Sequence, residues 1–425
     1  MATKTCINLA STQNLCYNLV KSVYTETHTP GDNTMNQTQK GILTLIRSAI
    51  TGQSLPLPED FDIEKAYPHI KRHCVIPLAY EGALQCGIPM DSPVMLSLLE
   101  GYGQNFMVSE EQMAAIRAIF TAFDENGIDY MPLKGCNMKP LYPKPELRVM
   151  GDADILIRVE QYPRIVPIME KLGFQYSKES NHEFVWHSKQ LFLELHKCLI
   201  PSYNKDYYKY FGNGWRLAKH REGTRYTMTQ EDTLVYLFTH FAKHYRDGGI
   251  GCLHVADLWV FLRSHPELDE KIVRTELSKL QLVDFYDNIR ALIHLWFEDG
   301  EETEKTQFIT DFIFQSGIWG KKESYILARE TRHAKAAGSL RGGRLRSFRT
   351  ALFPGLESMR EQYPILEKHS WLMPFLWPVR LVHIVLFRRD RIVARKNKWK
   401  LSSADNIQSY QQALTYVGLN FGFEE

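Results

Sequence analysis

The sequence lacks the features that mark several classes of protein. Its seven cysteines are scattered without a Cys-x-x-Cys pair or regular spacing, which argues against a disulfide framework or a zinc-finger module and favours a reduced, cytoplasmic protein. Its 51 Lys and Arg residues nearly balance its 49 Asp and Glu residues. The net field is therefore too weak to attract nucleic acid, which we do not expect as a partner.

Long apolar runs are also missing. The strongest, residues 371–387, is interrupted by two prolines, an arginine and a histidine, and it is shorter than the ~20 apolar residues of a membrane span. We therefore expect no stable membrane insertion. Because a basic run follows at residues 388–400, this segment is either a helix on an anionic membrane surface or, as we prefer, a helix packed on the domain with a solvated basic end.

The N-terminal residues 1–34 contain no apolar core of the kind found in a secretory signal. Their polar composition predicts an unstructured extension that is dispensable for folding. Met35 begins a segment typical of a helical domain, and it is a candidate start of translation.

Hydrophobic periodicity predicts helices, then a small sheet, then more helices. Helical spacing runs from residue 38 to about residue 120 and includes a long helix from Met95 to about Asn126, and it returns from Thr229 to the end of the chain, with Thr229–Arg263 as its first stretch. Between these regions we expect a first strand and turn after residue 127, a helix at Val159–Gly173, and strands at Phe174–Ser177, Glu183–His187 and Gln190–Leu199. The predicted fold is α+β, with a small mixed-sheet core flanked by N-terminal and C-terminal helical domains. The predicted boundaries are 1–34 for the extension, 35–126 for the N-terminal helical region, 127–225 for the α/β core, 226–330 for a helical domain and 331–425 for the C-terminal helical region with its basic tail.

The string Gly-Asp-Ala-Asp-Ile-Leu-Ile at residues 151–157 predicts paired carboxylates on a buried strand. Side chains alternate along a strand, so Asp152 and Asp154 are expected on one face. Two carboxylates so close can both stay ionised when they share Mg²⁺, which prefers oxygen ligands. The alternative is a pair of loop acids that cap a turn, but the apolar run after them favours the strand.

A third acid follows in Leu-Phe-Leu-Glu-Leu-His at residues 191–196. The leucines fall on one face of a strand, so Glu194 and His196 fall on the other. Glu183 on a neighbouring strand is the alternative third acid. His196 is either a site residue or a core histidine.

Together with Leu-Lys-Gly-Cys at residues 133–136, these pieces resemble the polymerase-beta-like nucleotidyltransferase superfamily. The fuller string "LKG…LYP…LR.MGDADILI…LGF…LELH" is similar to a poorly characterised bacterial group of nucleotidyltransferases. The similarity continues through residues 232–258 and covers most of the chain from about Leu43. It departs at the turn, where Gly135 precedes Cys136 instead of the usual Ser or Gly, and in a proline-rich interval before Asp152 that implies an inserted loop. We expect Cys136 to be a packing residue and not a nucleophile.

The resemblance implies transfer of a nucleoside monophosphate from an NTP to an acceptor by a two-metal-ion mechanism. Mg²⁺ or Mn²⁺ would be the cofactor and the NTP a substrate, while the base and the acceptor stay open. The implied catalytic and metal-binding residues are Asp152, Asp154 and Glu194, and the implied nucleotide-binding residues are Lys134, Gly135, Arg148 and Lys243. A non-catalytic nucleotide-binding or partner-binding module with the same fold is the alternative.

The helix predicted to begin at Thr229 carries further candidates. His240 and His244 lie one turn apart with Lys243 beside them, so they are possible accessory residues. They could equally be surface histidines. A His-x-x-x-His zinc site of the metalloprotease type is disfavoured, because Phe241 occupies the position of the required Glu.

Overall fold

The computed structural model describes residues 35–336, 338, 342, 349–350, 352–387 and 403–421. The chain divides into two compact units, Met1–Lys243 with Ile250–Trp319 and His244–Gly249 with Gly320–Glu425. The predicted extension at 1–34 and the basic run at 388–400 lie outside the described residues. Met35 is buried.

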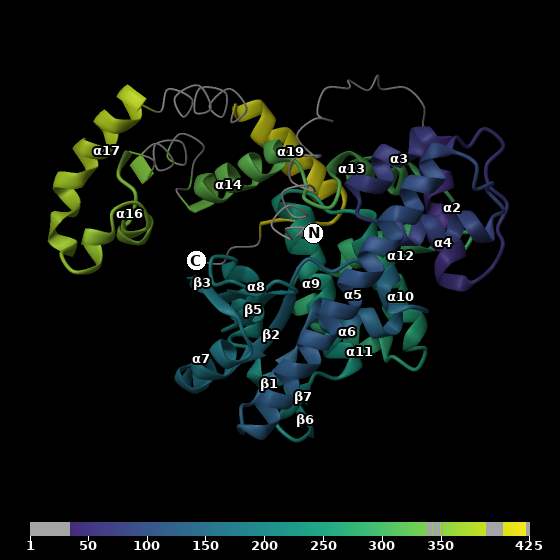
Figure 1. Ribbon diagram of the computed structural model, residues 1–425. Coiled ribbons are helices and arrows are strands. Elements are labelled where there is room, and N and C mark those ends of the chain that lie inside the picture. The colour runs from purple at the N-terminus through teal and green to yellow at the C-terminus, as the bar shows by residue number, and fades with distance from the viewer. Residues whose placement is uncertain are drawn as a thin grey trace, which may run out of the picture. The chain divides into compact units, whose positions relative to one another are not determined.

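The first unit contains a seven-stranded mixed sheet (Figure 1), with its strands in the order β3-β4-β5-β2-β1-β7-β6. The strands are β1 (Tyr130–Pro132), β2 (Ala153–Ile157), β3 (Gln175–Glu179), β4 (Glu183–His187), β5 (Phe192–His196), β6 (Lys219–Glu222) and β7 (Arg225–Thr227). The mixed α/β architecture is confirmed. The hairpin of β6 and β7 was not predicted, because its strands are short and β6 is polar and exposed throughout, so the hairpin has no alternating apolar pattern.

The first unit also contains the helices that Figure 1 labels α2 to α13. They are α2 (Gln37–Thr51), α3 (Ile63–Arg72), α4 (Ile76–Gln85), α5 (Pro93–Glu125), α6 (Lys134–Met138), α7 (Tyr162–Lys171), α8 (Lys205–Phe211), most of α9 (Gln230–Asp247), α10 (Cys252–Ser264), α11 (Glu270–Lys279), α12 (Val283–Phe297) and α13 (Glu304–Ser316). Short 3₁₀ turns occur at η1 (Lys139–Leu141), η2 (Pro145–Leu147), η3 (Val159–Gln161) and η4 (Trp215–Leu217).

The helical pattern predicted at Thr229–Arg263 forms two helices, α9 and α10, and the helix predicted to begin at Thr229 is α9. Three glycines lie between them, and Gly249 has a φ of +110°, a conformation that glycine adopts without strain. Within the helical spacing predicted from residue 38 to about residue 120, Tyr67 falls in α3 and Leu78 in α4, and Cys74 with its φ of +55° lies between the two helices.

One face of the sheet carries the apolar core of the first unit. Ile155 on β2 and Leu193 and Leu195 on β5 are fully buried there, and they form one cluster with Phe123 of α5 and Met169 of α7. Side chains alternate along a strand, so Asp154, Glu194 and His196 lie on the opposite face. The predicted division of the 191–196 segment into an apolar and a polar face is therefore what the sheet shows.

The second unit is helical in its described part. Its elements are α14 (Lys322–Ala336), α16 (Leu356–Gln362), η5 (Pro364–Glu367), η6 (Ser370–Leu372), α17 (Met373–Phe387) and α19 (Ala404–Tyr416). Helices α14 and α19 pack together, and the hydroxyl of Tyr410 donates to the carbonyl of Arg246.

Helix α17 forms where an apolar helix was expected, and only part of its surface packs on its own unit. Nε1 of Trp377 donates to the carbonyl of Pro354 at 3.2 Å, and its ring lies against that of Phe353. Phe375, in contrast, keeps 66% of its surface accessible, and Trp371, just before the helix, keeps 68%. Among the helices described here, none is both long enough and apolar enough to cross a bilayer.

Candidate functional site

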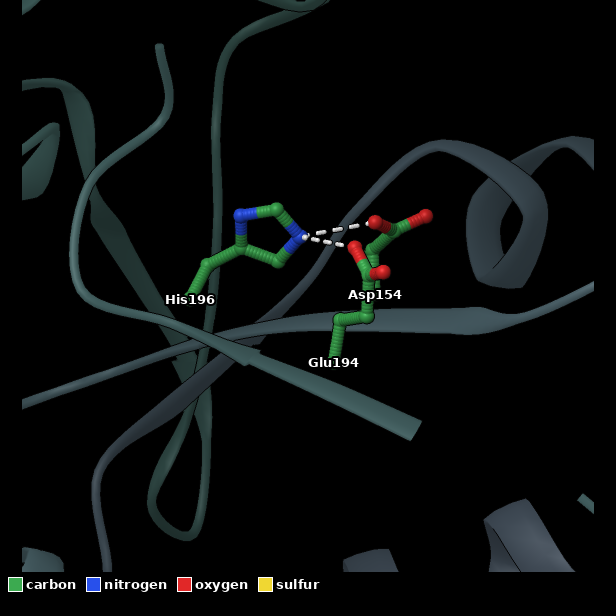
Figure 2. Close-up of side chains that lie close together, drawn as sticks. All are labelled: Asp154, Glu194 and His196. Atoms are coloured by element: carbon green, nitrogen blue, oxygen red, sulfur yellow. Dashed lines mark hydrogen bonds and ion pairs between the residues drawn. The ribbon is translucent and has the colours of Figure 1, made fainter. Parts of the chain in front are cut away.

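Parallel pairing of β2 with β5 brings together the two acids on the polar face. Asp154 is opposite Glu194 in the register, and Leu156 is opposite His196. The Nε2 atom of His196 lies 2.7 Å from Oδ1 of Asp154 and 3.4 Å from Oε2 of Glu194 (Figure 2). One ligand atom from each of the three side chains falls within 4.8 Å of the others. Across the part of the chain that the structure describes, this is the group of His, Cys, Asp and Glu side chains able to hold a metal ion.

Lys134 adds a cation to this group from the turn between β1 and α6. Its Nζ donates to Oδ1 of Asp154 at 2.6 Å, and the N–H of Leu133 donates to the carbonyl of Asp154 at 2.9 Å. Lys134 has a φ of +37°, which is strained for a side chain with a Cβ and is typical of functional turns. The turn therefore aims this lysine at the acid.

The charges in this group favour an ionised Asp154. Burial alone would raise the pKa of its carboxyl, but the charge of Lys134 and the hydrogen bond from His196 outweigh burial and hold that pKa well below its usual range. For His196, burial lowers the pKa, and the hydrogen bonds to Asp154 and Glu194 more than offset this, so the pKa is raised. Each group therefore stabilises the charge of its neighbour.

Asp152 lies at the edge of this group and not within it. The strand begins at Ala153, so Asp152 precedes β2, and Asp152 is exposed to solvent. Its carboxyl nevertheless loses hydration and faces the negative charges of Asp154 and Glu194, and these effects raise its pKa to about 7. The expected pairing of the two aspartates on one strand is thus only partly observed.

We expect Asp152→Asn to stabilise the metal-free protein in a pH-dependent way. An acid with a raised pKa in the folded state carries its charge at a cost that begins above the ordinary aspartate pKa and is complete above about 7. Thermal melting in EDTA should therefore show a small gain near pH 4.5 and a larger one at pH 8. An equal shift at both pH values would mean that the carboxylate does not feel its acidic neighbours.

Arg148 is placed beside the turn but is held by an acid of α10. Its Nε and Nη2 donate to the two carboxylate oxygens of Asp257 at 3.1 and 2.9 Å, and the hydroxyl of Tyr142 donates to the same acid at 2.8 Å. The pair is largely buried. The Nζ of fully buried Lys139 donates to the carbonyl of Arg148 at 2.8 Å. The proline-rich interval is thus an ordered loop, and Arg148 anchors it.

Gly135 is required because the backbone of the turn packs against this anchor. A Cβ on Gly135 would lie 2.9 Å from Nη1 of Arg148 and 2.9 Å from Sδ of Met150. Cys136 next to it is buried in the core cluster, and burial raises the pKa of its thiol to about 12. A thiol with so high a pKa is a packing residue at neutral pH.

We expect Gly135→Ala to displace Arg148 and to lower stability by about 1–3 kcal/mol, the usual cost of overpacking. Chemical denaturation would measure the loss. Gly151→Ala is the matched control, since a Cβ there meets nothing within 4 Å. If both variants unfold alike, the close approach at Gly135 is not a constraint.

Glu183, the alternative third acid, lies on β4 opposite His196. It is buried and forms an ion pair with Nε2 of His182 at 2.8 Å. Burial opposes its ionisation, but the hydrogen bond and charge of His182 lower its pKa. Glu183 is therefore a neighbour of the site with a partner of its own.

Helix α9 contributes a residue that the sequence analysis missed. Tyr236 is fully buried, and its hydroxyl has no hydrogen-bond partner among the residues that the structure describes. Burial raises the pKa of this hydroxyl, and the charges of Lys134, Asp154 and Glu194 also act on it. The phenol therefore lies within electrostatic reach of the acids.

The remaining candidates on α9 follow Tyr236 along the helix. His240 and Lys243 are four and seven residues further on, so they share its face, and the rings of Tyr236 and His240 lie 6.3 Å apart. His240 and Lys243 are both half-buried. His244 belongs to the second unit. The spacing from Tyr236 to His240 and Lys243 was the signal that could have identified the tyrosine.

The donor set fits a divalent cation. Carboxylates and imidazoles are both metal ligands. Nε2 of His196 lies 2.7 Å from a carboxylate oxygen of Asp154 and 3.4 Å from one of Glu194. Both distances are close to the ~3 Å that separates adjacent ligands around an octahedral ion with bonds of about 2.1 Å. The three side chains could therefore be neighbours around a single ion.

Comparison with known proteins places this site inside a recognised region. Residues 59–298, more than half of the 425-residue chain, match the model of a family described as uncharacterised nucleotidyltransferases. The matched region contains the whole sheet and the acidic group. No curated protein and no solved structure matches the chain.

Proposed function

Since this protein belongs to the uncharacterised nucleotidyltransferase family, we propose that it moves a nucleoside monophosphate from a nucleoside triphosphate to an acceptor hydroxyl. The observation that carries the proposal is the meeting of Asp154, Glu194 and His196 on one face of the sheet. Phosphoryl chemistry needs charge neutralisation and alignment more than a covalent intermediate. A compact group of metal-ligating side chains beside the half-buried Lys134 suits that need.

In the proposed mechanism each residue has a charge-based role. Asp154, Glu194 and His196 would hold a divalent ion, and Asp152 would supply a further carboxylate for a second ion bound with the nucleotide. When bound, such ions neutralise phosphate charge and lower the pKa of the attacking hydroxyl. Lys134, now paired with Asp154, turns to a phosphate oxygen, and Glu194 accepts the proton of the acceptor hydroxyl.

The backbone and the second helix complete the proposal. The turn at Gly135 lets the chain approach the phosphates closely, Lys243 on the Tyr236 face of α9 binds the triphosphate, and Arg148 supports the turn through its pair with Asp257. The reaction consumes an NTP and releases pyrophosphate. The acceptor is a hydroxyl compound of the cell.

The experiment is incubation of the full chain with each α-³²P-labelled NTP, a divalent ion and a cell lysate, followed by separation of the labelled products. We expect one labelled class of acceptor, formed with release of pyrophosphate, and no label with Asp154→Asn. Nucleotide binding without any labelled product would favour the non-catalytic binding module. Absence of both would reject the proposed function.

Tyr236→Phe should have different effects on NTP binding and on the stability of the protein. Removing a buried hydroxyl that has no partner should leave stability unchanged or raise it by about 1 kcal/mol, because such a group is costly to bury. If the hydroxyl meets the bound nucleotide, affinity for the NTP should fall by roughly 10-fold, the effect of one lost hydrogen bond of ordinary strength. Calorimetry and thermal melting of the same preparation would test both expectations. Weaker folding with unchanged affinity would make Tyr236 a core residue only.

A further inference from the structure

The third ligand of the candidate metal group is a nitrogen, and this has consequences for which ion it binds. The hard ions Mg²⁺ and Ca²⁺ prefer oxygen ligands. The metal ligands expected from the sequence were the three carboxylates of Asp152, Asp154 and Glu194. The structure instead places the imidazole of His196 against Asp154 and Glu194, with Asp152 outside the group. An imidazole ligand suits first-row transition ions.

We propose that Asp154, Glu194 and His196 form a resident site for a divalent transition-metal ion, filled in preference to Mg²⁺ before the nucleotide arrives. This deepens the proposed function, on which its catalytic meaning rests. The site itself needs neither nucleotide nor acceptor. The protein would provide one imidazole nitrogen and two carboxylate oxygens as ligands to the ion.

The position of His196 is fixed by the fold. The residue is 4% exposed, and it lies on the strand that pairs with β2 on one side and β4 on the other. Its Nε2 faces both acids at distances of 2.7 and 3.4 Å. The ring cannot turn to solvent without unpacking β5, so little ordering cost remains when an ion binds. The proton on Nε2 leaves to solvent as the nitrogen coordinates the ion.

A second observation points to a polar ligand at the same place. The hydroxyl of Tyr236 is fully buried, and no described residue forms a hydrogen bond with it. It lies close enough to Lys134, Asp154 and Glu194 for their charges to act on it. Buried hydroxyls are normally satisfied. An ion with its bound water would satisfy this one.

The first measurement uses the unaltered full chain without nucleotide. We expect pulsed electron paramagnetic resonance of the Mn²⁺-loaded protein to show coupling to a ¹⁴N nucleus of a coordinated imidazole. Bound Mn²⁺ without nitrogen coupling would overturn the proposal, and so would failure to bind any divalent ion. This spectrum does not depend on a variant that folds poorly.

The second measurement compares Co²⁺ with Mg²⁺ by calorimetry. Co²⁺ should bind the natural chain at least about 10-fold more tightly than Mg²⁺, and His196→Asp, which restores an all-oxygen set, should reduce that ratio by roughly 10-fold or more. His220→Gln on the exposed strand β6 is the matched control and should change nothing. An unchanged ratio in a folded His196→Asp protein would contradict the proposal.

The two proposals fail separately. Nitrogen coupling without any nucleotidyl transfer would remove the proposed function and keep the metal site. Transfer supported by Mg²⁺ alone, with no nitrogen coupling, would keep the function and remove the preference for a transition metal.

Discussion

Asp154→Asn is expected to abolish nucleotidyl transfer, with a loss of roughly 10³-fold or more, the scale on which one direct electrostatic contact to the reacting charge acts. The acid is 3% exposed and is shared by Lys134 and His196 at 2.6 and 2.7 Å. An amide keeps the shape of the side chain but lacks the negative charge that attracts a divalent ion. Product formation from labelled NTP measures the loss.

The same substitution should also destabilise the protein, contrary to what the sequence suggests. From the sequence alone, loss of one of two neighbouring carboxylates should relieve repulsion. In the structure, loss of the Asp154 charge leaves Lys134 and His196 largely buried beside each other. Removing one partner of a buried pair costs roughly 3–5 kcal/mol, and we expect about 3 here, because Glu194 still faces His196.

This stability loss has a definite pH dependence. Because the pKa of Asp154 is lowered in the folded state, its contribution is present above the ordinary aspartate pKa and disappears as the pH falls through the folded value. Melting curves in EDTA should therefore separate the natural chain from Asp154→Asn at pH 7 and bring them closer in acid. Asp152→Asn is the matched control, since it should move stability upwards. If both variants shift the melting temperature in the same direction, the assignment of the buried and exposed acids is wrong.

How far the sequence predicts this site depends on the range of the contacts. Alternation along one strand is local, so the polar face of Glu194 and His196 could be predicted from the leucines around them. The contact of His196 with Asp154 depends on the parallel register of β2 with β5, which no local pattern specifies. The role of Tyr236 depends on where α9 lies relative to the acids. Strand β2 forms where a strand was expected, but it begins at Ala153, and Asp152 lies outside the group.

Arg148 lies close to the site, as its position in the sequence suggests, but its guanidinium contacts a different group from the one expected. Its sequence position beside the acid strand predicts a phosphate ligand. The structure places it beside the turn at Gly135, but its guanidinium donates to Asp257, an acid more than 100 residues away. A pairing over that distance cannot be predicted from one sequence without a structure. Burial of the Arg148–Asp257 pair leads to a prediction about the stability of the protein.

We expect Asp257→Ala to lower the free energy of unfolding by roughly 3–5 kcal/mol, because it leaves a buried guanidinium without its counter-ion. Side chains of both partners are only 11–12% exposed, and the hydroxyl of Tyr142 loses its acceptor as well. Urea denaturation would give the change, and hydrogen exchange would show whether α10 and the loop around Arg148 open first.

The double variant Arg148→Met with Asp257→Ala tests whether this cost comes from the unpaired charge. Removing both charges should recover much of the loss, since apolar replacement of a buried pair is often nearly neutral. The exposed pair Arg274–Asp287, with side chains 44% and 48% accessible, is the control, and its disruption should cost no more than about 1 kcal/mol. A double variant as unstable as Asp257→Ala would show that Asp257 acts through packing or through Tyr142. In that case the turn at Gly135 would be held by the apolar contacts of the loop, and Arg148 would again be available as a phosphate ligand.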